Sequence, residues 1–168
     1  MIVILHNIRS MHNVGSIFRT ADAAGVGKIY LCGITPAPID KFGRLRQQIS
    51  KTALGAEKYV KWEYVKSTPL LLGKLKKQGY KILAVEQSKK SIPYFSVSFP
   101  RNLSSTAIGE RESRKKIALV LGNEIKGLPC SILNRADKIL EIPMRGRKES
   151  LNVAVAFGIV VFHLLSDK

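Results

Sequence analysis

Short apolar runs alternate along this chain with longer segments that carry helix signals. Pro69 in a first turn and Gly79 at an end bound one such segment, and Gly25 closes another. Strands that alternate with helices indicate an α/β fold with a mostly parallel sheet and helices on both faces. The expected strands are 2–8, 28–34, 57–65, 81–87, 116–122 and 138–144, and the expected helices are 15–25, 68–79, 128–136 and 150–166.

The last of these helices has an unusual pattern. From Val153 to Phe162 every residue is Val, Ala, Phe, Gly or Ile, so the helix has no polar face and is predicted to be buried on all sides. It begins, however, with Ser150 and Asn152. Ser150 is a good N-cap, but a cap does not account for Asn152. Polar residues at the start of a buried helix either cap the helix or belong to a binding site.

Composition predicts a single domain over residues 1–168, since 45% of the residues are hydrophobic and 24% are charged. The longest apolar run is too short to span a bilayer, and residues 1–10 lack the features of a signal peptide, so a soluble cytoplasmic protein is expected. Cys32 and Cys130 form no CxxC pattern, and the three histidines offer no metal-ligand spacing. Reduced thiols are expected, with no disulfide and no metal.

The charge indicates a class of partner. Twenty-eight Lys and Arg residues against twelve Asp and Glu residues give a net charge of +16. Such an excess attracts a polyanion by releasing its counterions, and nucleic acid is the leading candidate. The alternative is a well-solvated basic surface. The basic residues cluster at 41–51, 111–116 and 145–148, which favours a binding footprint over a uniform coat.

Ligands of parallel α/β sheets bind beyond the carboxyl ends of the strands, and the segment 13–21 follows the first expected strand. Asn13 can cap the helix there, and Gly15 allows another backbone to come close. Arg19 lies about a turn and a half inside the helix, with its side chain leaning back toward the N-terminus. It is therefore either an anion-binding residue or a solvated helical arginine.

A second unusual strand end is 119–127, where a buried run leads directly into Gly122, Asn123 and Glu124. A glycine there permits close approach of backbone and ligand. A turn after a buried strand does not require a carboxylate, so Glu124 is a candidate site residue. The segment contains neither a GxGxxG fingerprint nor a Walker A loop.

Three stretches together resemble a known family. They are NVGSIFRTADAAGV at 13–26, IALVLGNEIKGLP at 117–129 and LEIPMRGRKESLNVAVAFGI at 140–159. They are similar, in this order, to motifs one, two and three of the SpoU/TrmH family of RNA ribose 2'-O-methyltransferases, within the SPOUT superfamily. The segment 51–60 also resembles the linking segment of the tRNA-modifying members. The resemblance covers nearly the whole chain.

The resemblance implies a SPOUT-type fold whose C-terminal third forms a deep trefoil knot, although knots are very rare in proteins. It also implies that S-adenosylmethionine binds in that knot. The apolar last helix would then be buried in the knot and dimer core, while its polar start closes over the cofactor. The cofactor-binding residues carried over by motif matching are Ala84, Glu86, Gly122, Ile142, Met144, Ser150, Leu151 and Asn152.

The same resemblance implies the catalytic set. Arg19 takes the central role, either as the base or as a clamp on the phosphate beside the target ribose. A guanidinium stays protonated at neutral pH, so the clamp is the physically easier role. Asn13 would hold the Arg19 helix and contact RNA, and Glu124 would orient the site or Asn152. Ser150 and Asn152 would position the ribose or the cofactor.

Homodimers are implied as well, in which motif one meets the cofactor site of the partner subunit. Phe157, Val161 and Leu164 could supply part of that interface, or could fill only the core of one chain. No separate RNA-binding domain is expected before motif one, so tRNA is favoured as the substrate and ribosomal RNA comes next. The competing functions are a catalytically inactive RNA-binding protein and a nucleotide-binding α/β enzyme of another kind.

Overall fold

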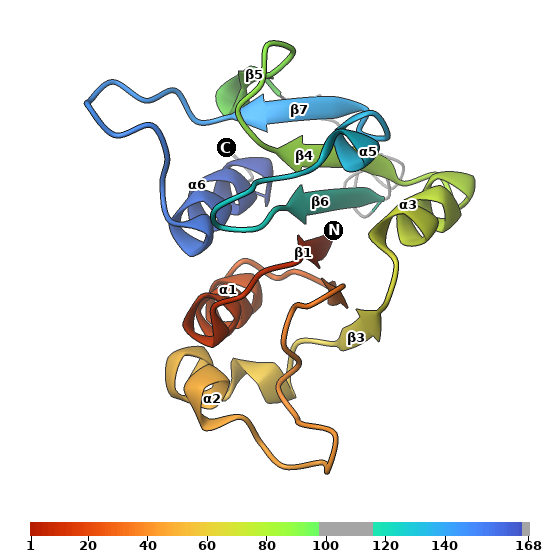
Figure 1. The fold of residues 1–168 in the computed structure, drawn as a ribbon, viewed down its shortest axis with the longest axis vertical. Coiled ribbons are helices and arrows are strands. Elements are labelled where there is room, and N and C mark those ends of the chain that lie inside the picture. Colours follow the sequence, from red (N-terminus) through yellow and green to blue (C-terminus); the bar gives the residue numbers. More distant parts are fainter. Residues whose placement is uncertain (98–115, 166–168) are drawn as a thin grey trace, which may run out of the picture.

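The computed structural model describes residues 1–97 and 116–165. Its centre is a seven-stranded sheet in the order β3-β2-β1-β6-β4-β7-β5, and every neighbouring pair is parallel (Figure 1). All residues of β6 are buried, as expected for a central strand with helices on both faces. The strands are β1 Ile2–His6, β2 Lys28–Cys32, β3 Trp62–Val65, β4 Lys81–Val85, β5 Ile92–Pro93, β6 Ile117–Leu121 and β7 Lys138–Glu141.

Helices cover both faces of the sheet, which confirms the predicted architecture. α1 (Met11–Ala23) and α6 (Val153–Leu165) pack over one face, and their buried side chains join those of alternate strand residues in one core cluster. α3 (Thr68–Lys77) and α5 (Cys130–Leu133) cover the other face through a second cluster. The predicted helix 68–79 is confirmed with Pro69 in its first turn, and Gly79 follows it with a φ of +82°.

One helix was not predicted from the sequence. α2 (Gln47–Ala53) overlaps the end of the basic cluster 41–51 and packs against α1. The contact is close because Gly15 has no side chain: a Cβ there would collide with the Ile49 carbonyl oxygen and the Thr52 hydroxyl. The prediction that Gly15 admits another backbone is therefore confirmed.

Both predicted N-caps were wrong. The side chain of Ser10, and not that of Asn13, caps α1 by accepting a hydrogen bond from the Asn13 backbone N–H at 3.2 Å. At α6 the cap is Asn152, whose Oδ1 accepts from the Ala154 N–H at 2.9 Å. Ser150 precedes the first residue of the helix by three positions and is exposed. Either helix could start at any of several polar residues, and long-range contacts choose among them.

The segment 57–65 is only partly a strand. A short 3-10 helix, η1, occupies Ala56–Lys58, and β3 begins at Trp62. The strand β5 was not predicted, because a two-residue strand leaves no period to read. Within the predicted basic cluster 111–116, residues 111–115 lie outside the described residues.

The helix α6 is not buried on all sides, contrary to the prediction from its composition. Phe157, Val161 and Leu164 are at most 2% exposed and fill the core of this chain. These three residues are therefore not available to a dimer interface, and they fill the core of one chain, which was the alternative prediction. Val155 and Phe162 are 51% and 49% exposed. The apolar surface that α6 leaves uncovered thus lies on the face opposite to the three buried residues.

The described residues contain no helix long and apolar enough to cross a membrane. Both cysteines are free: Cys32 is buried in β2, and Cys130 is exposed at the start of α5. Burial raises the pKa of the Cys32 thiol to about 11, so this thiol stays protonated and unreactive at neutral pH.

We expect a maleimide to label one thiol per chain in the native protein at pH 7 and both thiols after denaturation. Mass spectrometry of the labelled protein measures this directly. The variant Cys130→Ser should take no native label. Rapid native labelling of Cys32 would contradict its burial.

Candidate active site

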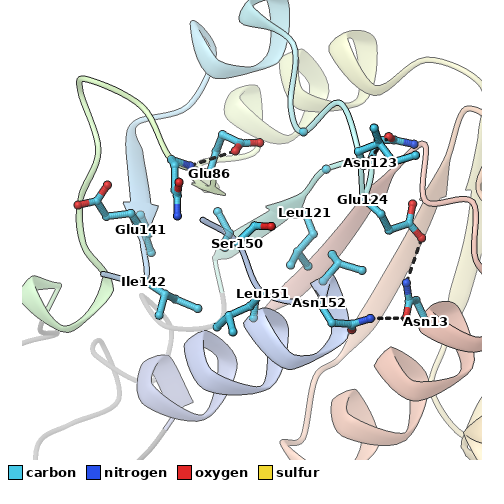
Figure 2. A pocket seen from close by; sticks show the side chains of 18 of the residues that line it. Asn13, Glu86, Leu121, Asn123, Glu124, Glu141, Ile142, Ser150, Leu151 and Asn152 are labelled. Carbon is cyan, nitrogen blue, oxygen red and sulfur yellow. Dashed lines mark hydrogen bonds between the residues drawn. The ribbon is translucent and has the colours of Figure 1, made fainter. Parts of the chain in front are cut away.

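A cavity of about 310 Å³ opens at the carboxyl ends of β4, β6 and β7 (Figure 2). It lies where a ligand was predicted to bind, at the carboxyl edge of a parallel sheet. Every residue predicted to bind the cofactor lines it except Ala84, and so does every predicted catalytic residue except Arg19. These lining residues are Asn13, Glu86, Gly122, Glu124, Ile142, Met144, Ser150, Leu151 and Asn152.

The loop after β6, residues 122–128, forms one wall of the cavity and is held by its own hydrogen bonds. Asn123 Oδ1 accepts from the N–H groups of Ile125 at 3.0 Å and Lys126 at 2.9 Å. Asn123 Nδ2 donates to the Asn7 carbonyl oxygen at 2.7 Å, which ties the loop to the end of β1. This wall is therefore shaped before any ligand arrives.

Two glycines let this loop fold tightly against its neighbours. A Cβ on Gly122 would lie 2.7 Å from the carbonyl carbon of Gly127 and 2.8 Å from the nitrogen of Leu128. Gly127 has a φ of +63°, and a Cβ there would collide with the carboxylate of Glu86. Glu86 Oε2 accepts from the Leu128 N–H at 2.7 Å. The end of β4 and the loop after β6 are thus joined through Glu86.

A chain of hydrogen bonds links the three motifs across the cavity (Figure 2). Asn13 Nδ2 donates to Glu124 Oε1 at 3.1 Å, and Asn152 Nδ2 donates to Asn13 Oδ1 at 3.0 Å. Glu124 also accepts from the backbone N–H groups of Arg9 and Ser10, each at 3.0 Å. Glu124 was predicted to orient the site or Asn152, and it reaches Asn152 through Asn13.

The same contacts set the charge of Glu124. Partial burial by itself raises the pKa of this carboxyl group, but hydrogen bonds donated by Arg9, Ser10 and Asn13 outweigh burial and hold the pKa below its usual value of 4.5. The group is therefore ionised at neutral pH. Its lowered pKa contributes stability that is complete above pH 4.5 and is lost as the pH falls through the folded-state value.

We expect Glu124→Gln to lower the free energy of unfolding at pH 7 by about 1–3 kcal/mol, because an amide cannot accept all three hydrogen bonds. The difference in melting temperature from the wild type should shrink as the pH falls below about 4.5. Thermal unfolding followed by circular dichroism across this range measures it. Glu149→Gln is the matched control, since no hydrogen bond joins the Glu149 carboxylate to the described residues. A pH-independent difference would contradict the ionised role.

The segment between β7 and α6 closes the cavity from the side. It extends past the carboxyl ends of the strands before it returns to α6 (Figure 1). Ile142, Met144, Ser150 and Leu151 all line the cavity from this segment. Gln87 Nε2 donates to the Glu149 carbonyl oxygen at 2.7 Å and holds the segment against the end of β4.

Arg19 lies outside the cavity. It is exposed and lines a separate hollow that Lys51, Thr52 and Phe162 also line, between α1, α2 and α6. Asn13, six residues before Arg19 on the same helix, lines the cavity instead. From its position in α1, Arg19 was predicted to reach an anion at the start of its own helix. In a single chain, however, its side chain does not line the cavity.

Ala84 does not line the cavity in this structure. It is fully buried in β4 and packs in the second core cluster, while its neighbour Val85 lines the cavity. Successive strand residues point to opposite faces, so only one of the two can face the cavity.

Sequence reasoning missed Gln87 and Glu141 among the polar lining residues, and it noted Asn123 at a strand end without giving it a role. Each follows or ends an apolar strand run, and this signal was available. Within residues 1–97 and 116–165, no group of three or more His, Cys, Asp and Glu side chains could hold a metal ion.

These features define a parallel α/β protein with a preformed cavity at the strand ends, and comparison with known proteins identifies its family. The sequence model of the SpoU rRNA Methylase family matches residues 1–162. The chain belongs to this family.

Curated relatives include the tRNA (guanosine(18)-2'-O)-methyltransferase of Aquifex aeolicus (strain VF5), which is 32% identical over 96% of this chain and 67% of its own length. The 23S rRNA (guanosine-2'-O-)-methyltransferase RlmB of Neisseria meningitidis serogroup B (strain ATCC BAA-335 / MC58) is 34% identical over 96% of this chain and 56% of its own length. The chain thus spans between about half and two thirds of these relatives.

Solved structures show the same fold. The A. aeolicus TrmH/SpoU tRNA modifying enzyme has a TM-score of 0.77 at 31% identity and is matched over 98% of this chain and 73% of its own. The AdoMet-bound rRNA methyltransferase from Sinorhizobium meliloti has a TM-score of 0.80 at 28% identity, over 97% and 54% of the two chains.

Proposed function

We propose that this protein transfers a methyl group from S-adenosylmethionine to a ribose 2'-hydroxyl of RNA. The observation that carries the proposal is the convergence of three sequence motifs on one cavity, where Asn13, Glu124 and Asn152 are joined by hydrogen bonds. Family membership supports the same reaction. The predicted catalytic and cofactor-binding residues other than Arg19 and Ala84 are proposed to act from this cavity.

The cavity suits S-adenosylmethionine in size and in chemistry. Its volume lies at the lower end of the range for small-molecule sites. Leu121, Leu140 and Ile142 offer apolar surface to an adenine ring, and the Glu86 and Glu141 carboxylates can accept hydrogen bonds from ribose hydroxyls. The cofactor supplies an electrophilic methyl group on a sulfonium sulfur.

The protein's own groups must then align the ribose and help to remove its proton. Asn152 is fixed from both sides, by Asn13 and by its cap on α6, so its amide can hold a ribose oxygen in one position. Ser150 lies in the same lining with a hydroxyl that donates and accepts. Positioning by these groups supplies much of the rate.

We propose further that the active form is a homodimer in which Arg19 of one chain reaches the cavity of its partner. Arg19 lies beside the exposed apolar side chains of Phe162 and Leu54, which line the same hollow. Val155 lies two turns before Phe162 on the same side of α6. A second copy that covers these side chains would bring the Arg19 guanidinium to a phosphate at the partner's cavity.

We expect Phe162→Glu to sediment as a monomer at micromolar concentration and to lose turnover, because burying a carboxylate in an apolar interface is unfavourable. Analytical ultracentrifugation and a methyl-transfer assay measure the two effects. The control Leu70→Glu changes an exposed residue of α3, on the opposite face of the sheet. A monomeric wild type would remove the dimer proposal.

The C-terminal third is proposed to form a deep trefoil knot. Because β7 lies beyond β4 and α6 packs on α1, the chain after β7 must return across the carboxyl edge of the sheet. The bond from Gln87 to Glu149 brings this returning segment against the loop that follows β4. A segment passing by that loop supports a knotted path.

We propose tRNA as the substrate, with ribosomal RNA as the alternative, and residues 1–168 as one catalytic domain acting in the cytoplasm. The resemblance of 51–60 to tRNA-modifying members favours tRNA, and the high positive charge suits either RNA. The names of the Aquifex and Neisseria relatives specify guanosine, so guanosine is the nucleoside to examine first. A ribose on an exposed loop offers an accessible 2'-hydroxyl.

The test is transfer of labelled methyl from S-adenosylmethionine to unmodified bulk tRNA and, separately, to ribosomal RNA, followed by nuclease digestion. A labelled 2'-O-methylnucleoside from one pool supports the proposal and selects the substrate. Binding should also weaken by tenfold or more between about 50 and 200 mM salt if several phosphates are contacted. RNA binding with no transfer to either pool, and no calorimetric binding of S-adenosylmethionine, would favour the inactive RNA-binding protein instead.

A further inference from the structure

The loop between β2 and α2 presents an aromatic side chain to solvent. Phe42 is 67% exposed, although phenylalanine is normally buried. The Lys41 Nζ and the Arg44 Cζ each lie 4.9 Å from the centre of its ring. Exposed aromatic rings with cations close by are the features on which proteins stack the bases of single-stranded nucleic acid.

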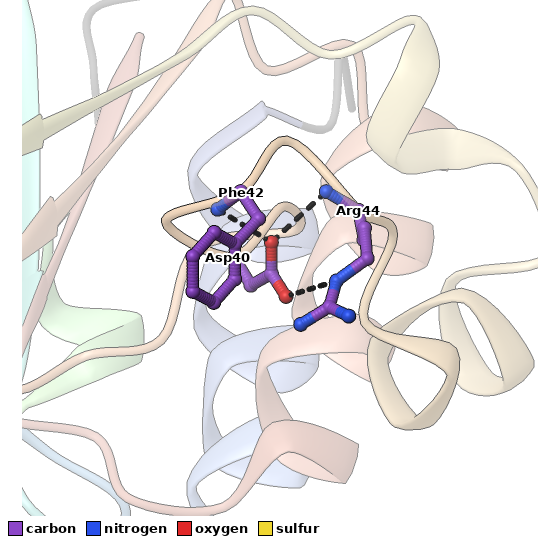
Figure 3. A network of polar contacts seen from close by, with 3 residues as sticks. All are labelled: Asp40, Phe42 and Arg44. Atoms are coloured by element: carbon purple, nitrogen blue, oxygen red, sulfur yellow. Dashed lines mark hydrogen bonds and ion pairs between the residues drawn. The ribbon is translucent and has the colours of Figure 1, made fainter.

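The loop is rigid by construction (Figure 3). Asp40 Oδ1 accepts from the backbone N–H groups of Phe42 at 2.8 Å and Arg44 at 2.9 Å, and Oδ2 accepts from the Arg44 Nε at 3.0 Å. A bridge between Ile39 and Leu45 closes the base of the loop. The backbone that carries the ring is thus held in place in the free protein, which lowers the entropy lost when a ligand binds.

The cations of this loop keep free hydrogen-bonding capacity. Asp40 uses the Nε of Arg44, and the remaining guanidinium N–H groups make no hydrogen bond to the described residues. The free N–H groups of Arg44, next to an exposed ring, suit a phosphate oxygen.

Two hollows lie between the cavity and this loop, and each shares lining residues with the next. A second hollow shares Asn123, Ile125 and Gly127 with the cavity wall, and also contains Lys126. A third hollow shares Arg9 and Ile34 with the second. The third hollow ends at Lys41 and Arg46, in the loop that carries Phe42.

Charge along this route favours a polyanion. Arg9, Lys126, Lys41 and Arg46 line the second and third hollows. The carboxylate in the third hollow, that of Asp40, is already paired with Arg44. Glu124, at the cavity end, is engaged by its three donors.

We infer that RNA runs from the cavity along the 122–128 loop and past Arg9, and that an unpaired base near the target nucleotide stacks on Phe42 while Arg44 binds the adjacent phosphate. This inference rests on the proposed function, because the target ribose must lie in the cavity. The loop thereby selects RNA in which nucleotides near the target are unpaired.

The test compares Phe42→Leu with Phe42→Trp, using bulk unmodified tRNA and ribosomal RNA as ligands in filter-binding measurements. Loss of the ring should weaken RNA binding on the order of tenfold, and the tryptophan should restore it. Where turnover is measurable, Phe42→Leu should raise the KM for RNA while the Kd for S-adenosylmethionine stays unchanged. Tyr59→Leu, at a 77% exposed aromatic residue outside the three hollows, is the matched control.

Arg44→Gln should reduce the slope of log K against log salt concentration by about 0.7, the value for one phosphate contact on single-stranded nucleic acid. Lys77→Gln removes one charge at the end of α3, near the amino edge of the sheet, and should leave the slope unchanged. RNA binding by Phe42→Leu that equals the wild type overturns the inference, whether or not methyl is transferred.

The two proposals fail separately. RNA binding that depends on Phe42, in a protein that transfers no methyl group, would refute the proposed reaction and support the stacking site. Normal methyl transfer with RNA binding indifferent to Phe42 would do the reverse.

Discussion

Arg19→Ala is expected to reduce methyl transfer by about 100- to 1000-fold, because Arg19 is proposed to hold the phosphate beside the target ribose and to stabilise the oxyanion that develops on its 2'-oxygen. The Kd for S-adenosylmethionine should change by no more than a few fold, because Arg19 does not line the cavity of its own chain. Single-turnover transfer and calorimetric titration measure the two quantities. A large loss of cofactor affinity would mean that Arg19 has been assigned the wrong role.

Two controls separate charge from geometry. Arg19→Lys keeps the charge but loses the planar fork that binds a phosphate through two hydrogen bonds, so it should recover little activity. Lys51→Ala removes a cation from the same hollow and should be far milder. An active Arg19→Lys would favour a simple electrostatic role over a phosphate clamp.

A subunit-mixing experiment tests whether Arg19 acts across the dimer. Arg19→Ala and Asn152→Ala are each expected to be inactive alone. If Arg19 serves the partner's cavity, each mixed dimer contains one intact site, and random mixing restores about a quarter of wild-type activity. A mixture that stays inactive would show that both residues must come from the same chain.

Gly122→Ala is expected to weaken binding of S-adenosylmethionine by tenfold or more. The added Cβ would lie 2.7–2.8 Å from the Gly127 carbonyl carbon and from Leu128 atoms. Backbone atoms cannot rotate away, so the 122–128 loop must open, and the Leu128 bond to Glu86 is lost with it. Overpacking of this kind lowers stability by about 1–3 kcal/mol.

Gly73→Ala is the matched control for this substitution. Gly73 lies inside α3, and a Cβ there has nothing within 4 Å. Since alanine is the better helix former, this change should raise stability by up to about 1 kcal/mol and leave cofactor affinity unaltered. Wild-type affinity in Gly122→Ala would show that the loop is not part of the cofactor site.

Local pattern was sufficient to predict the sheet and most of its helices. The run at 117–121 consists of Ile, Ala, Leu and Val, which only a strand buried on both faces accommodates, and β6 occupies it. Pattern failed at α2, because the helix 47–53 is too short and too polar to show a clear apolar period. Packing against Gly15 stabilises it instead.

The site residues, too, were predictable only in part from local pattern. Glu86, Gly122, Glu124 and Asn152 could be chosen because each stands at the end of a strand or the start of a helix, where motif matching applies. Motif matching pointed to Ala84, whereas its neighbour Val85 lines the cavity, because alternate residues of a strand face opposite sides of the sheet.

The sequence by itself determined a parallel α/β fold, a high positive charge, and a set of residues that meet at the carboxyl ends of the strands. The fold and the site residues follow from the spacing of apolar residues and from the polar residues that interrupt it, and the charge follows from composition. Only the tertiary structure decided that Asn13 binds Asn152, that Arg19 faces away from the cavity, and that Phe42 stands exposed on a rigid loop. Each of these depends on how distant segments pack, and a local pattern carries no distances between them.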